Sequence, residues 1–230
     1  MQKKQPQKTG AQPPPAVQLA DSRKVEAGLS VLELLVVLLL FSALTATALT
    51  LVVQANKSLQ NRLSSSTLTS TGLPALNQMT REIRMAGFPT DKSFTGSAVA
   101  SYPGIVATPF VTASSYDLVF EADTNGDGVV ERIEYVIPEG STTITRRSTL
   151  KNANGTLATS STASTAFLEN VQNQLQGQPL FAWDLDPLSA KPFPQNIRTV
   201  YINAILKARG NVSGGPINMT FTATCQRMNP

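Results

Sequence analysis

Hydrophobic positions follow three successive patterns along the chain. Residues 29–53 form an almost uninterrupted apolar run in which Glu33 is the only charged residue. Residues 54–88 keep a helical spacing of apolar positions, and from Ser114 onward apolar and polar positions alternate. A helical stretch followed by a series of strands predicts an α+β fold with one long N-terminal helix packed on an antiparallel sheet.

The apolar run is long enough to cross a membrane. At 1.5 Å per residue a helix over residues 29–53 would be ~37 Å long, against a hydrocarbon thickness of about 30 Å. A polar leader, residues 1–28, precedes it and holds five basic and two acidic residues. The positive leader predicts a single-pass protein whose N-terminus stays in the cytoplasm and whose C-terminal part is exported. An ordinary secretory signal has the opposite order, because its apolar region comes before the cleavage site.

Residues 54–88 are expected to be the exported, amphipathic half of the helix. A Ser/Thr-rich segment with Gly72 and Pro74 brings weak helix formers together, so we expect a kink or break there. A stripe with helical spacing then resumes and should pack on the sheet: Leu73, Leu76, Met79 or Thr80, and Ile83. Gly87 as a C-terminal cap and Pro89 after it should end the helix.

The β-rich domain is expected to span residues 89–230. Alternating positions predict strands near residues 116–122, 133–137, 141–150, 179–186, 196–208 and 217–225. Residues 151–166 are predicted to be a polar loop with a turn at Asn154–Gly155. In the last strand Cys225 falls on the apolar face, where it should be a buried small hydrophobe.

Composition excludes several classes of enzyme. The chain has no histidine and a single cysteine, so it has no Ser-His-Asp or Cys-His site, no zinc site built from Cys and His, and no disulfide within one chain. The net charge of +4 comes mostly from the leader, since the remainder carries 14 basic and 13 acidic residues. We therefore expect no catalytic residues and no nucleic-acid binding.

The segment Gly28, Leu29 and Glu33 carries the most specific signal. It resembles the class III signal of type IV pilins and secretion pseudopilins, with Leu29 in place of the usual phenylalanine. The segment "REIRMAGFP" further resembles a signature of PilW-type minor pilins and J-type type II secretion pseudopilins. The resemblance implies cleavage after Gly28 by a prepilin peptidase, methylation of the new N-terminus at Leu29, and pairing of Glu33 with the N-terminal amine of a neighbouring subunit.

The resemblance also implies partners and a location. These are other pilins or pseudopilins bound through the N-terminal helix, the prepilin peptidase/methyltransferase, an inner-membrane assembly platform, and finally a pilus or pseudopilus. Two alternatives stay open. One is a membrane-anchored, exported binding or adhesive module that does not polymerise, and the other is a DNA-uptake (competence) pilin. A basic strip with aromatic residues would favour the second, but the near-neutral mature chain has no obvious strip.

An acidic loop, "DTNGDGVVERIE", allows two interpretations. Asp123, Asn125, Asp127, Gly128 and Glu134 fit a calcium-loop pattern, so Ca²⁺ is a possible ligand.

Strands on both sides, however, favour a β-hairpin turn and would carry Glu134 away from an ion. A hairpin-borne ion site would use Asp123, Asn125, Asp127 and Glu131.

Overall fold

The structure is a computed structural model that describes residues 30–159, 163–208 and 217–228. The leader, Gly28 and Leu29 lie outside the described residues. The chain divides into two compact units, Met1–Thr50 and Leu51–Pro230. In the first unit the described residues are helical from Val31 onward, and the second unit contains the remainder of that helix and the strands.

Helix α1 runs without interruption from Val31 to Arg84. The predicted break near Gly72 and Pro74 is therefore wrong, since both residues lie inside the helix. Hydroxyl groups of the Ser/Thr-rich segment donate to carbonyl oxygens three or four residues earlier, as Thr67 does to Leu63 and Ser70 does to Thr67. These residues thus find hydrogen-bond partners within the helix instead of competing with it.

Gly72 is used for close packing and not for a break. A Cβ atom at this position would lie 2.9 Å from the ring of Phe221 and 3.0 Å from Leu206, so a larger residue here would force these two side chains to shift. Burial of the neighbouring Leu76, Met79 and Ile83 also stabilises this part of the helix. Packing therefore outweighs intrinsic helix propensity here.

The helix ends at Arg84, and Gly87 terminates it as expected. Gly87 has a φ of +82°, in the left-handed region that favours glycine, and its N–H donates to the carbonyl of Glu121. Three short helices follow: η1 (Asp91–Ser93), α2 (Gly96–Ser101) and η2 (Pro103–Ile105). The described helix thus ends a few residues before the predicted boundary at residue 88.

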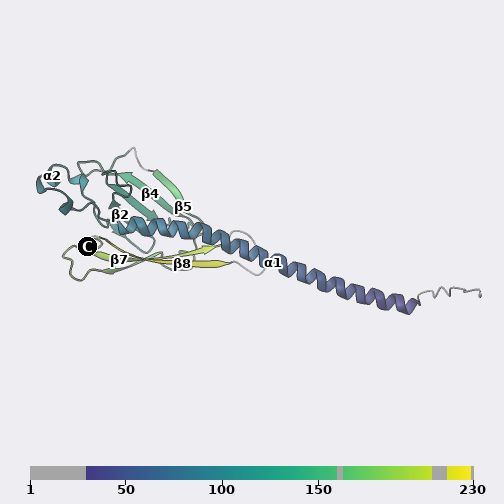
Figure 1. Cartoon of the computed structure of the whole chain (residues 1–230). Helices are drawn as coiled ribbons and strands as arrows, with labels where there is room; N and C mark the ends of the chain where they lie inside the picture. The colour runs from purple at the N-terminus through teal and green to yellow at the C-terminus, as the bar shows by residue number, and fades with distance from the viewer. Residues whose placement is uncertain (1–29, 160–162, 209–216, 229–230) are drawn as a thin grey trace, which may run out of the picture. The chain divides into compact units, whose positions relative to one another are not determined.

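Two antiparallel sheets are present where a single sheet was expected (Figure 1). The five-stranded sheet has the order β1-β2-β3-β4-β5 and the three-stranded sheet the order β6-β7-β8. The strands are β1 (Thr112–Ala113), β2 (Asp117–Ala122), β3 (Glu131–Val136), β4 (Ile144–Leu150), β5 (Ala163–Leu168), β6 (Phe181–Leu185), β7 (Ile197–Lys207) and β8 (Asn218–Gln226). The antiparallel α+β class is confirmed, and the sheet count is corrected.

Strand β5 is the element that the sequence pattern missed. Its first residues were assigned to the polar loop 151–166, but they pair with β4, with Ser164 opposite Arg147 and Thr165 opposite Arg146. The turn at Asn154–Gly155 is confirmed by a φ of +86° at Gly155. The polar loop is therefore shorter than predicted.

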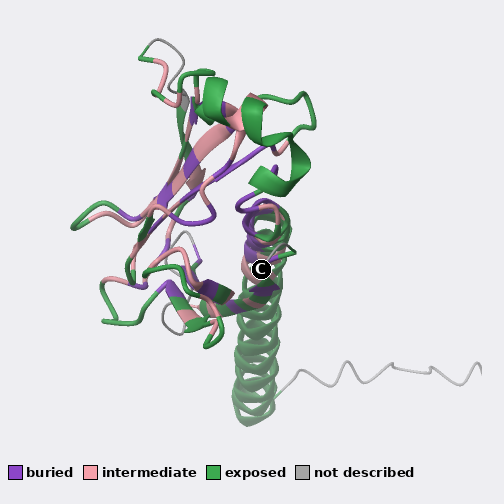
Figure 2. Cartoon of the chain, turned by 90° about the vertical axis from the view of Figure 1, so that its left-hand side faces the viewer, coloured by how far each residue is buried: buried purple, intermediate pink, exposed green. Residues whose placement is uncertain are grey.

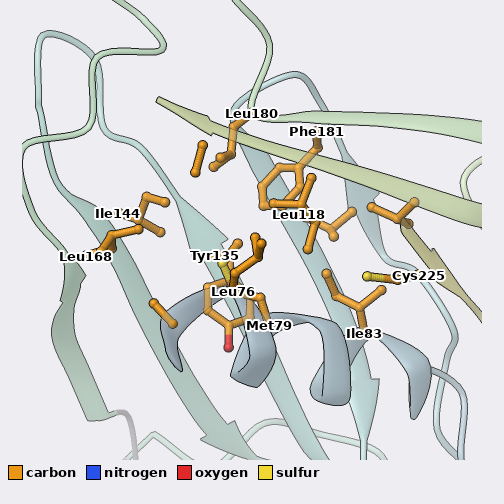
Figure 3. Close-up of a cluster of buried hydrophobic side chains, with 14 of the residues drawn as sticks. Leu76, Met79, Ile83, Leu118, Tyr135, Ile144, Leu168, Leu180, Phe181 and Cys225 are labelled. Atoms are coloured by element: carbon orange, nitrogen blue, oxygen red, sulfur yellow. The ribbon is translucent and has the colours of Figure 1, made fainter. Parts of the chain in front are cut away.

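The core lies between the C-terminal part of α1 and the two sheets (Figure 3). Met79 and Ile83 of α1 are buried to 0% and 1% exposure, together with Leu118 and Tyr135 of the five-stranded sheet and Cys225 of β8. Burying one such side chain fully contributes about 1.5–3 kcal/mol. The buried face of β8 confirms the prediction for Cys225.

Candidate functional site

The N-terminal part of α1 is rich in exposed hydrophobic side chains. Every large hydrophobic side chain from Val31 to Val53 is exposed, with exposed fractions from 50% at Val53 to 76% at Val31 (Figure 2). Soluble monomers rarely expose apolar patches beyond a few hundred Å². This surface is therefore suited to lipid or to the apolar faces of other helices.

The length and composition of this segment also suit a membrane. No charged residue occurs between Leu34 and Asn56, which corresponds to ~34 Å of helix. The helix is long and apolar enough to cross a membrane, with a mean hydropathy of 2.5 in its most apolar part. A membrane-spanning role is thus compatible with both its length and its exposure.

The hydroxyl groups inside the apolar segment are all used within the helix. Each donates to a carbonyl three or four residues earlier at 2.7–2.8 Å: Ser42 to Leu39, Thr45 to Phe41, Thr47 to Leu44 and Thr50 to Thr47. An unpaired polar group in a hydrocarbon environment costs several kcal/mol. These bonds remove that cost.

Glu33 is the exception in this segment. It lies in the first turn of α1, where the helix dipole favours a negative charge. Its side chain is exposed, and it has no ion-pair partner among residues 30–159, 163–208 and 217–228. The predicted processing residues Gly28 and Leu29 fall outside these ranges, so the structure places only Glu33 of the three.

The acidic loop is arranged as a hairpin turn between β2 and β3. The carboxylate of Asp123 accepts hydrogen bonds from the N–H groups of Gly126 at 2.7 Å and Gly128 at 3.0 Å. Asn125 donates to Asp127, and the Asp127 carboxylate also accepts from the N–H of Val129. The loop acids thus stabilise the turn itself.

The tentative ligands Asp123, Asn125, Asp127 and Glu131 are not brought together as a metal centre. Within the described part of the chain, no three Asp, Glu or Cys side chains are grouped so that they could hold a metal ion. Glu131 accepts instead from the hydroxyl of Thr124 at 3.1 Å. Glu134 lies in β3 and pairs with Arg147 at 2.8 Å, as expected for a strand that leads away from the loop.

Two buried carboxylates were missed by the sequence analysis. Glu82 of α1, 3% exposed, accepts from the hydroxyl of Tyr135 at 2.7 Å, Nε of Arg146 at 3.0 Å and the amide of Gln78 at 2.9 Å. Burial and the charge of Glu82 raise the pKa of Tyr135 well above its usual range. The only signal in the sequence is that Glu82 lies beside Ile83 in the apolar stripe.

Glu121 of β2 is the second buried carboxylate. Its oxygens accept from Arg132 and Lys151, both at 2.7 Å, and from the N–H of Thr108 at 2.9 Å. Burial acts to raise the pKa of Glu121, but the hydrogen bonds from Lys151, Arg132 and Thr108 outweigh it and lower the pKa. Both networks join elements within the second unit, Leu51–Pro230, which is called the β-rich unit below.

Comparison of the chain with protein-family models, with curated proteins and with solved structures gave no match.

Proposed function

We propose that this protein is a prepilin-type minor pilin or pseudopilin, a structural subunit of a type IV pilus or type II secretion pseudopilus. The observation that carries the proposal is the exposed apolar part of α1 with Glu33 as its single charge. The proposal places the chain in the inner membrane before assembly, with its N-terminus in the cytoplasm and residues 54–230 exported.

The physical argument concerns the cost of Glu33. A carboxylate at the centre of a bilayer costs about 2.5–3.5 kcal/mol on insertion scales, and less near the interface. Cleavage after Gly28 would create an amine at Leu29, which would also be costly in lipid. When helices pack side by side with a stagger, the amine of one subunit and Glu33 of the next neutralise each other.

The charges of the β-rich unit argue against the DNA-uptake alternative. Four of its 14 basic residues are committed to ion pairs, which leaves fewer cations for phosphates: Arg132, Arg146, Arg147 and Lys151. A strip that binds phosphates needs cations that are free to neutralise them. The membrane anchor that does not polymerise remains the main rival, because it also needs the apolar segment. It differs from the pilin proposal in giving Glu33 no role.

Processing of the N-terminus tests the proposal directly. The full chain is expressed together with a prepilin peptidase, and the N-terminal peptide is identified by mass spectrometry. We expect a mature chain that begins with N-methylated Leu29. Gly28→Leu should accumulate as precursor, whereas the matched leader variant Gly10→Leu should mature normally. An unprocessed wild-type chain, or normal maturation of Gly28→Leu, would contradict the proposal.

Assembly is tested separately through Glu33. Glu33→Gln keeps the shape of the side chain but removes its charge, so we expect normal membrane insertion and strongly reduced incorporation into filaments. Ser42→Ala is the control, because it changes a polar residue of the same segment without removing a charge. Wild-type incorporation of Glu33→Gln would favour an anchor that does not use the glutamate.

A further inference from the structure

Strand β8 is the longest of the four edge strands in the described sheets. It extends from Asn218 to Gln226, pairs with β7 without a register shift, and contains no charged residue and no proline. The other edges are short or irregular, since β1 has 2 residues, β6 has a register shift at Asp184/Leu185, and the pairing of β5 shifts at Ile144/Thr145. Short length, charges, prolines and bulges are the usual protections of an edge, and β8 has none of them.

The outer edge of β8 is open in the described part of the chain. There the backbone of residues 218–226 hydrogen-bonds to β7 alone. Its exposed face carries Asn218, Thr220, Thr222, Thr224 and Gln226, and the opposite face carries Met219, Phe221, Ala223 and Cys225. An open edge with high β-propensity is a template for a strand of another chain.

We propose that the partner is a second copy of this chain, paired antiparallel through β8 with Thr222 opposite Thr222 of the second copy. The strand is complementary to itself in this register. On the exposed face Thr220 meets Thr224, and Asn218 meets Gln226. On the other face the larger residues meet smaller ones, Phe221 opposite Ala223 and Met219 opposite Cys225. Threonine pairs and matched sizes across strands stabilise a sheet, and a two-fold interface requires such self-complementarity.

The position of α1 leaves room for this pairing. Gly72 touches both Phe221 of β8 and Leu206 of β7, so the helix lies over these two strands. With strands about 4.8 Å apart, the two α1 helices of the pair would lie about 10 Å apart, close to the usual 8–10 Å between packed helices.

An exposed hydrophobe lies on the flank of α1 that would face the second helix. The carbonyl of Arg84 accepts from the N–H of Met228 just after β8, and Leu73 lies three turns before Arg84 on the same side of the helix. Leu73 is 45% exposed in the single chain. The pair would cover it.

The pairing also fixes how the two copies are oriented. Gly72 contacts Phe221, and the carbonyl of Arg84 accepts from the N–H of Met228, so this part of α1 runs in the same direction as β8. An antiparallel β8 pair therefore joins copies whose α1 helices run in opposite directions. The pair would connect different filaments or membranes, and it adds a contact that the proposed assembly through α1 does not supply.

Charge substitutions on the exposed face of β8 test the pairing. The purified full chain in detergent is measured by light scattering on a sizing column, and we expect a protein mass about twice the 24.5 kDa of one chain. Thr222→Lys places two like charges opposite each other at the two-fold axis and should give monomers. A mixture of Thr222→Lys with Thr222→Glu should restore the pair.

The matched control is Ala182→Lys, which adds the same charge to an exposed position on β6, at the opposite edge of the same sheet. It should leave the mass unchanged.

Cross-linking gives a second measurement. Thr222→Cys should form a disulfide between two copies under mild oxidation, whereas Ala182→Cys should not. A monomeric wild-type chain, a Thr222→Lys chain that still pairs, or equal cross-linking of both cysteine variants would overturn the proposal. None of these measurements depends on N-terminal processing, so their failure is distinguishable from failure of the pilin proposal.

Discussion

Replacing Glu82 with alanine should strongly destabilise the β-rich unit. The carboxylate is 3% exposed and accepts from Tyr135, Arg146 and Gln78, which tie α1 to β3 and β4. Its removal leaves a buried hydroxyl and a largely buried guanidinium without their acceptor. Breaking a buried ion pair by removing one partner costs about 3–5 kcal/mol. The Arg146 side chain is 18% exposed and can recover some hydration, so we expect the lower end, about 3 kcal/mol.

Urea unfolding of the full chain in detergent measures this effect. Trp183 is the chain's single tryptophan and lies half-buried on β6, so its fluorescence reports on unfolding of this unit. With an m-value of about 2 kcal/mol/M, a loss of about 3 kcal/mol lowers the urea midpoint by about 1.5 M.

Two further variants make the test of Glu82 decisive. Glu134→Ala removes the carboxylate of a more exposed ion pair, in which the side chain of Arg147 is 47% exposed and that of Glu134 23%. This change should cost less than about 1 kcal/mol. Combining Glu82→Leu with Arg146→Met and Tyr135→Phe should recover most of the lost stability, because no buried polar group then lacks a partner. A midpoint for Glu82→Ala no lower than that for Glu134→Ala would refute the reasoning.

Three other outcomes are expected. The pKa of Glu121 is lower in the folded chain than its ordinary value of 4.5, so the charged carboxylate stabilises the fold above pH 4.5 and this stabilisation is lost as the pH falls through the folded-state pKa. Urea midpoints should therefore decrease on acidification, and less steeply in Glu121→Gln. Millimolar calcium should leave the melting temperature unchanged, because the loop acids already accept from backbone N–H groups; a rise that Asp127→Ala abolishes would restore the ion site. Cys225 is 0% exposed and burial raises its pKa, so a thiol reagent should label it slowly until urea unfolds the chain, and rapid labelling of the native chain would contradict its burial.

The sequence predicted the elements whose own side chains decide their structure. Alternation in β2, β3 and β8 was visible because one face of each strand packs into the core while the other is largely polar. Glu33 could be recognised as unusual for a similar local reason, since a charge within an apolar run is identified from the neighbouring sequence alone.

The features that the sequence did not reveal depend on residues far away along the chain. Strand β5 is held by pairing with β4, although its Ser164 and Thr165 give no strong pattern. The helix continues through Gly72 because Phe221 packs against it. Glu82 pairs with Arg146, which is 64 residues further along the chain, and Glu121 pairs with Lys151, which is 30 residues further along. Neither network could therefore be recognised from local spacing.

The hydroxyl groups inside the apolar part of α1 have the same hydrogen-bond energy in lipid as among other helices, because their acceptors lie in α1 itself. Ser42, Thr45, Thr47 and Thr50 keep the same acceptors whether lipid tails or other helices surround them, so moving between the two exchanges none of their hydrogen bonds. Glu33 is then the one charged side chain there, and its energy depends on where the helix is. At the bilayer centre a cost of about 2.5–3.5 kcal/mol corresponds to a factor of roughly 70–400 in a partition constant, and the factor is smaller near the interface. The choice between lipid and a bundle of helices would thus be set by one carboxylate near the start of the helix, and a single amine beside it could reverse that choice.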